Sequence, residues 1–218
     1  MAEERTCLPL PDELSYVDGA LVSCGFGTAY EALQRVDVSG RDSVLITGLG
    51  PVGLATAMLA RAMGAGPIVG TDVAPERLEV ATDLGLVDHA LASDEETAAR
   101  LADLSGGRGF PVAVDCSGNA AARHLALSST ATWGRCAFVG EGGDVGFDVS
   151  HLLIHKQITV YGSWVTSVGH MGDLLAHLSR WRLHPQDIVT DRFSLEDAGQ
   201  AYDLADHGTS GKVCIVYE

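Results

Sequence analysis

Three glycines follow a short apolar run in the order Gly48-Leu49-Gly50-Pro51-Val52-Gly53. The preceding residues, 43–47, have the composition of a buried strand, and residues 51–63 have the apolar spacing of a helix. In such a turn the first glycine permits a tight bend, the second lets a ligand approach the backbone, and the third lets the helix pack closely on the strand. The free N–H groups at the helix N-terminus attract anions. The pattern therefore predicts a phosphate-binding turn, and the alternative is a packing turn that binds no ligand.

An acidic residue, Asp72, closes the second apolar run of the chain, at 67–72. A carboxylate at this place accepts hydrogen bonds from ribose hydroxyls and repels a 2′-phosphate, so it favours NAD over NADP. We interpret the nearby Arg77 as a ribose or adenine contact. A structural alternative is that Asp72 caps the helix expected from Pro75. A competing ligand with the same sequence features is S-adenosylmethionine, which would make the protein a methyltransferase.

Apolar strand-like runs alternate with helical patterns along most of the chain. Strands are expected at 43–47, 67–70, 89–92, 112–116, 135–140 and 158–162, and helices at 51–63, 75–84, 95–104, 120–128 and 171–181. Strands that are apolar throughout and alternate with helices form a parallel sheet covered on both faces. The predicted fold is therefore α/β, with a doubly wound six-stranded parallel sheet of the Rossmann type.

Two segments depart from this alternation. Residues 15–36 have a helical pattern that Cys24-Gly25-Phe26-Gly27 interrupts, and the last strand, 213–217, has no obvious place in the six-stranded sheet. We expect that last strand to belong to another sheet.

The composition excludes several classes of function. The chain has 218 residues and a formal charge of −15, and so acidic a surface repels nucleic acid. No apolar run approaches the ~20 residues that span a membrane, and the N-terminus has no secretion signal. The five scattered cysteines are typical of reduced thiols, so we expect a cytoplasmic protein. From the charge and the length of the apolar runs we expect no nucleic-acid or membrane partner.

Several motifs together resemble the medium-chain, zinc-dependent alcohol dehydrogenases, and most of all their threonine- and polyol-dehydrogenase-like branch. They are the turn at 48–53, Thr71-Asp72 with Arg77, Asp115-Cys116-Ser117-Gly118-Asn119, Phe138-Val139-Gly140-Glu141-Gly142 and Tyr161-Gly162-Ser163-Trp164. The resemblance runs from about residue 6 to the C-terminus. Apart from the resemblance, six parallel strands with glycines at 140, 142 and 143 after the fifth favour a dinucleotide over S-adenosylmethionine, because the second half of the sheet is needed to hold the nicotinamide half.

The resemblance implies a set of NAD contacts. They are Thr28, Gly48, Gly50, Pro51, Val52, Gly53, Asp72, Arg77, Ser117, Val139, Gly140, Glu141, Ser163, Val165 and Lys212. Lys212 is implied to reach a phosphate, and the alternative is a solvated lysine after a turn.

Cys24 matches the family cysteine that serves as the last ligand of the catalytic zinc. Such a zinc has two cysteines, one histidine and a water, and it polarises the alcohol oxygen. The alternative is a small buried thiol between two helices. The family's other ligands lie in an N-terminal catalytic domain that has no match here, and no histidine precedes Cys24. His151 and His155 have a spacing seen in some zinc pairs, but we interpret them as surface or interface residues.

The resemblance divides the chain into three parts: 1–22, a remnant and crossover from a missing catalytic domain; 23–190, the NAD-binding domain; and 191–218, a segment that returns toward the catalytic domain. It implies hydride transfer from a secondary alcohol, such as a polyol or a threonine-like substrate, to NAD. The alternative is a non-catalytic NAD-binding module or a split subunit that needs a separate catalytic chain. We expect the chain alone to be inactive. We also expect a homo-oligomer, with a dimer formed through the edge of the strand at 158–162, although the sequence leaves open that this strand is central.

Overall fold

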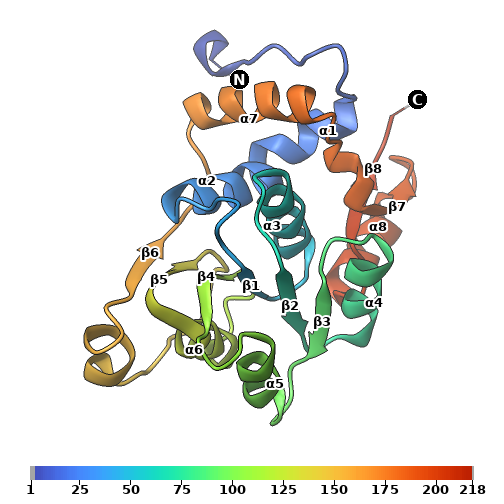
Figure 1. Ribbon diagram of the computed structural model, residues 1–218. Coiled ribbons are helices and arrows are strands. Elements are labelled where there is room, and N and C mark those ends of the chain that lie inside the picture. The colour runs from blue at the N-terminus through green and yellow to red at the C-terminus, as the bar shows by residue number, and fades with distance from the viewer. Residues whose placement is uncertain (1–2, 218) are drawn as a thin grey trace.

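A computed structural model of the chain describes residues 3–217, and its centre is a six-stranded parallel sheet (Figure 1). The strands lie in the order β3-β2-β1-β4-β5-β6. Their bounds are β1 Val44–Thr47, β2 Ile68–Asp72, β3 His89–Ala92, β4 Phe110–Asp115, β5 Thr130–Phe138 and β6 Thr159–Gly162. The expected doubly wound fold is confirmed.

Helices cover both faces of this sheet. The α-helices are α1 Tyr16–Leu21, α2 Gly27–Arg35, α3 Pro51–Ala62, α4 Pro75–Asp83, α5 Thr97–Leu104, α6 Ala120–Ser129, α7 Val168–Trp181 and α8 Ala198–His207. The shorter elements are 3-10 helices η1 Glu4–Thr6 and η4 Pro185–Ile188, and π-helices η2 Val22–Phe26 and η3 Ser150–Ile154.

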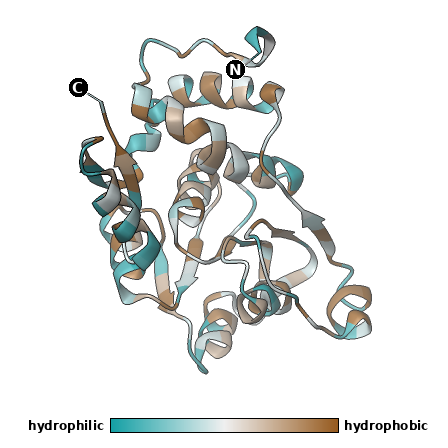
Figure 2. Cartoon of the chain, turned by 180° about the vertical axis from the view of Figure 1, so that it is seen from behind, coloured by the Kyte–Doolittle hydropathy of each residue, from teal (hydrophilic) through white to brown (hydrophobic). Residues whose placement is uncertain are grey.

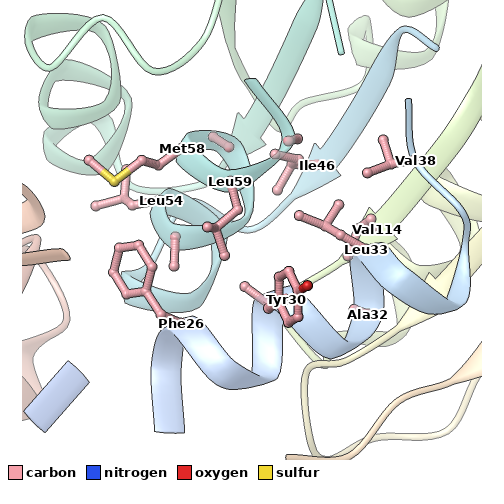
Figure 3. Packing of buried hydrophobic residues seen from close by; sticks show 14 of the residues in the cluster. Phe26, Tyr30, Ala32, Leu33, Val38, Ile46, Leu54, Met58, Leu59 and Val114 are labelled. Atoms are coloured by element: carbon pink, nitrogen blue, oxygen red, sulfur yellow. The ribbon is translucent and has the colours of Figure 1, made fainter. Parts of the chain in front are cut away.

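Two hydrophobic clusters form the core, one on each face of the sheet. Successive residues of a strand point to opposite faces, and β1 shows this directly. Ile46 joins Leu33, Leu54 and Leu59 in the cluster under α2 and α3 (Figure 3). Leu45 belongs to the second cluster, which the helices α5 and α6 cover. The turn that follows β1 is therefore anchored from both sides.

The helical pattern at 15–36 is continuous rather than broken. The interruption expected at Cys24–Gly27 is the π-helix η2, which joins α1 to α2. The start of β5 also differs from the prediction at 135–140. The strand begins at Thr130, and its register against β4 shifts between Phe110 and Val112. The apolar pattern of the sequence does not indicate such a local irregularity.

The C-terminal strand lies outside the main sheet, as expected. β8 Lys212–Ile215 pairs in parallel with β7 Val189–Phe193 to form a separate two-stranded sheet. Hydrophilic residues colour much of the chain near this end (Figure 2), and most of α8 is exposed. Over residues 3–217, no helix combines the length and apolar character that crossing a bilayer requires.

Candidate nucleotide-binding site

The turn between β1 and α3 needs two of its glycines for packing. Gly48 has φ +92°, and a Cβ there would lie 2.8 Å from Cβ of Ser117. A Cβ on Gly53 would lie 1.9 Å from the carbonyl oxygen of Gly48. No side chain fits at either position without a shift of the backbone.

Gly50 is different, because packing does not require it. A Cβ there would meet the guanidinium of Arg77 at 3.7 Å, an ordinary contact, and its backbone is extended. Gly50 also precedes the first residue of α3 without a side-chain cap, so N–H groups of the first turn stay free for an anion. Because packing does not require a glycine at this position, its presence is consistent with the close approach of a phosphate-bearing ligand.

Asp72 is buried at the carboxyl end of β2, with 4% of its surface exposed. Its Oδ2 accepts a hydrogen bond from the N–H of Leu49 at 2.7 Å, and its Oδ1 accepts one from the N–H of Ala74 at 2.9 Å. Nη1 of Arg77 lies 3.6 Å from Oδ2. The residue that caps α4 is Ala74, so the alternative role of Asp72 as that cap is wrong. The carboxylate fixes the glycine turn and keeps further lone pairs for a ligand.

A cavity of about 470 Å³ opens between the carboxyl ends of β1, β2 and β4. This volume is in the range of small-molecule sites, and the place is the point at which the strand order reverses. Four predicted contacts line it: Gly48, Asp72, Arg77 and Ser117. The other lining residues were not predicted as contacts: Thr71, Val73, Ser93, Asp94, Glu95, Thr97, Ala98, Asn119, Ala121, Ala122 and Leu125. They come from separate strands, loops and helices, and only the Thr71-Asp72 and Asp115–Asn119 motifs carried a sequence signal for any of them.

A smaller hollow of about 70 Å³ adjoins the glycine turn. Pro51, Arg77 and Lys212 are among the residues that line it, so the structure brings Lys212 from β8 close to the start of α3. Val52, also predicted, is partly buried against the larger core cluster. Two cations near the free N–H groups of α3 suit a diphosphate.

The predicted nicotinamide contacts lie outside the lining of the large cavity. Val139, Gly140 and Glu141 follow β5, and the N–H groups of Val139 and Gly140 both donate to the carbonyl of Asp115, at 2.9 and 3.0 Å. Thr28 is partly buried near the start of α2.

Ser163 and Val165, which follow β6, have features that contacts within the described residues do not explain. The hydroxyl of Ser163 is buried and has no hydrogen-bond partner among the described residues. Val165 has φ +45°, a strained conformation for a β-branched residue. Such groups are typical of sites whose partner is a ligand.

The described residues do not form a complete zinc site around Cys24. Cys24 is exposed, so the alternative of a buried thiol is wrong. Across residues 3–217, no group of three or more histidine, cysteine, aspartate or glutamate side chains is placed to hold a metal ion. His151 and His155 are exposed, with ring centroids 6.4 Å apart, and belong to no such group.

Comparison with known proteins places these features in one family. Residues 51–180 match the family described as zinc-binding dehydrogenase. The chain is 53% identical over 216 residues to an uncharacterized zinc-type alcohol dehydrogenase-like protein, YphC, of Escherichia coli K12, covering 99% of this chain and 61% of that protein. It is 32% identical to an L-threonine 3-dehydrogenase of Vibrio parahaemolyticus, covering 96% of this chain and 60% of that enzyme.

A solved structure agrees with these matches. The alcohol dehydrogenase TADH of Thermus sp. ATN1 superposes with a TM-score of 0.85 at 30% identity, covering 96% of this chain and 60% of that one. The chain thus spans about three fifths of the length of the relatives named here. By its glycine turn, its sheet and these matches, the chain belongs to the zinc-binding dehydrogenase family.

Proposed function

We propose that this chain is the NAD-binding portion of a zinc-dependent dehydrogenase that transfers hydride from a secondary alcohol to NAD. The observation that carries the proposal is the turn at 48–53, where packing requires Gly48 and Gly53 but not Gly50, beside a buried Asp72. The threonine dehydrogenase among the relatives suggests a small polyol or β-hydroxy amino acid as substrate.

The residues present fit NAD. Asp72 and Arg77 would bind the adenosine ribose, while the first turn of α3 and Lys212 would bind the diphosphate. Val139, Gly140, Ser163 and Val165, with Thr28, would surround the nicotinamide. When bound, NAD supplies the carbon that accepts the hydride.

The residues present do not fit a complete catalytic zinc, since no group of three or more potential ligands forms among the described residues. A second candidate function is that of a non-catalytic NAD-binding module or a split subunit, in which the chain holds NAD and a separate polypeptide supplies the catalytic groups.

Fluorescence titration of the chain with NADH and NADPH tests which of the two cofactors it binds more tightly. We expect NADH to bind more tightly, because the carboxylate of Asp72 repels a 2′-phosphate. An Asp72→Ser variant should reduce the difference between the affinities for NADH and NADPH. An Arg108→Met variant, changed at an exposed residue before β4, should leave that difference unchanged. Equal affinities of the unaltered chain for both cofactors would overturn the interpretation of Asp72.

Zinc content and alcohol oxidation by the same preparation distinguish the two candidate functions. We expect NADH binding without turnover and with less than stoichiometric zinc. Turnover with one zinc per chain would instead show that the chain completes the metal site by itself.

A further inference from the structure

Arg123, on α6, has no role in the contacts predicted for the cofactor, yet its guanidinium is nearly buried, with 12% of the side chain exposed. It donates hydrogen bonds to the carbonyl oxygens of Gly140, at 2.6 Å, and of Gly143. Its Cζ lies 5.8 Å from the ring centroid of Phe138, the last residue of β5. One side chain thus binds the loop at 139–143 at two points.

The same guanidinium lies against a fully buried carboxylate. Nε of Arg123 is 3.5 Å from Oδ2 of Asp115. Asp115 also accepts hydrogen bonds from the hydroxyls of Thr47, at 2.9 Å, and Ser117, at 2.7 Å, and from the N–H of Gly118, at 3.0 Å. Asp115 therefore fixes the turn at 116–119, and Arg123 connects that turn to the loop at 139–143. We call this pair the Asp115–Arg123 clamp.

The two segments joined by the clamp touch through their backbones. A Cβ on Gly118 would lie 2.0 Å from the carbonyl oxygen of Glu141, and a Cβ on Gly140 would lie 2.1 Å from the nitrogen of Gly118. Because no side chain would fit between the two backbones, a small displacement of one segment must displace the other or break the contact between them. The turn lines the large cavity through Ser117 and Asn119, while the loop carries residues expected around the nicotinamide.

We propose that Arg123 is a positioning residue that holds the 139–143 loop in place for the nicotinamide half of NAD. The proposal rests on the proposed function, since it assumes that the chain binds NAD. Without the guanidinium, Asp115 keeps its bonds to Thr47, Ser117 and Gly118, so the adenosine cavity keeps its shape. The carbonyls of Gly140 and Gly143 lose this donor, so among the described residues the loop is held only through the N–H groups of Val139 and Gly140, and its later residues gain freedom to move away from the nicotinamide.

The test compares the unaltered chain with Arg123→Met, which keeps the apolar stem, and with Arg123→Lys, which keeps the charge. Calorimetric titration gives the affinity for NADH and for AMP, which occupies only the adenosine half. Hydrogen–deuterium exchange reports the mobility of 139–146, and Arg108→Met is the control for loss of one exposed arginine. Circular dichroism checks that each variant is folded.

We expect Arg123→Met to weaken NADH binding by about tenfold or more and AMP binding by less than about twofold, because charged hydrogen bonds to the loop are lost. Exchange at 139–146 should rise, and Arg123→Lys should recover part of both effects. Equal weakening of NADH and AMP, or no change in either, would overturn the positioning role.

Failure of the proposed function has a different result, in which the unaltered chain binds no NADH. Hydrogen–deuterium exchange then still tests whether Arg123 holds the loop at 139–143. Unchanged exchange at 139–146 in Arg123→Met would show that the Asp115–Arg123 clamp does not hold it.

Discussion

Gly50 and Gly53 belong to one turn, but their missing side chains have different consequences. At Gly53 the space is filled by the backbone of Gly48, whereas a Cβ at Gly50 would make only an ordinary contact of 3.7 Å with the guanidinium of Arg77. The fold therefore requires a glycine at position 53 but not at position 50, where we expect the ligand to require it. A sequence motif alone does not separate these two requirements.

The two glycines should therefore respond differently to alanine. Gly53→Ala should lower the unfolding free energy by more than about 2 kcal/mol, because a backbone shift is needed to relieve the contact. Gly50→Ala should leave thermal unfolding nearly unchanged and weaken NADH binding, since the new methyl group occupies the ligand's approach. Thermal denaturation and NADH titration measure the two effects. Gly172→Ala, in α7 with no atom within 4 Å of the added carbon, is the matched control.

The cysteines also divide by environment. Burial raises the pKa of Cys116 and of Cys136 to about 12, whereas Cys7 and Cys24 are exposed. Because the thiolate is the reactive form, iodoacetamide at about pH 8 should alkylate Cys7 and Cys24 and spare Cys116 and Cys136, whose pKa values are raised. Peptide mass spectrometry measures the extent at each site, and the denatured chain provides the reference in which every thiol reacts. Labelling of Cys116 as fast as Cys24 in the native chain would contradict the structure.

At the scale of elements, α1 is joined to a segment distant in sequence through one buried carboxylate. Asp18 has 0% exposure, accepts a hydrogen bond from the N–H of Ser15 at 2.8 Å in a capping box, and accepts another from the N–H of Gln186 at 2.8 Å. It therefore holds α1 against η4. Burial acts to raise the pKa of Asp18, but the hydrogen bonds from Gln186 and Ser15 outweigh it, and the net pKa is lowered.

A lowered folded-state pKa fixes the sign of the pH dependence. The stabilisation by Asp18 is present above its usual pKa of 3.8 and is lost as the pH falls through the folded-state value. Asp18→Asn should lower the unfolding free energy by about 1–2 kcal/mol at neutral pH. The Asp18→Asn variant should also lose less of its unfolding free energy than the unaltered chain as the pH falls below 3.8. Urea denaturation at a series of pH values measures both, with the exposed Asp12→Asn as control. An unchanged acid decline would refute this role.

At the scale of the whole molecule, the sequence was informative where its pattern is local. Apolar runs predicted the strands, and the glycine turn with Asp72 predicted where a nucleotide would bind. The cavity lining is harder to predict, because Ser93, Thr97 and Leu125 meet there from separate elements. Arg123 carried no signal, since a lone arginine in a helix looks the same whether it is solvated or clamped to Asp115. Such residues are defined by contacts between segments that are remote in sequence.

The arrangement of the sheet also settles the place of β6. It pairs with β5 and lies at the edge of the six-stranded sheet, so the alternative of a central strand is wrong. Its residues, Thr-Val-Tyr-Gly, carry no charge. An uncharged edge strand favours pairing with another strand, and the simplest partner is a copy of itself across a two-fold axis.

We therefore predict that the chain forms a dimer through β6. Sedimentation equilibrium should give twice the chain mass, and Thr159→Lys should shift the equilibrium toward monomer, because charges on an edge strand oppose edge-to-edge pairing. Thr159 is exposed, so the substitution leaves the core intact. Thr209→Lys makes the same change at an exposed residue near β8 and should leave the dimer unaffected. The added positive charge reduces the net charge of −15 equally in both variants, so general repulsion cannot explain a difference between them. A monomeric unaltered chain, or a Thr159→Lys variant that remains dimeric, would show that β6 is not the contact.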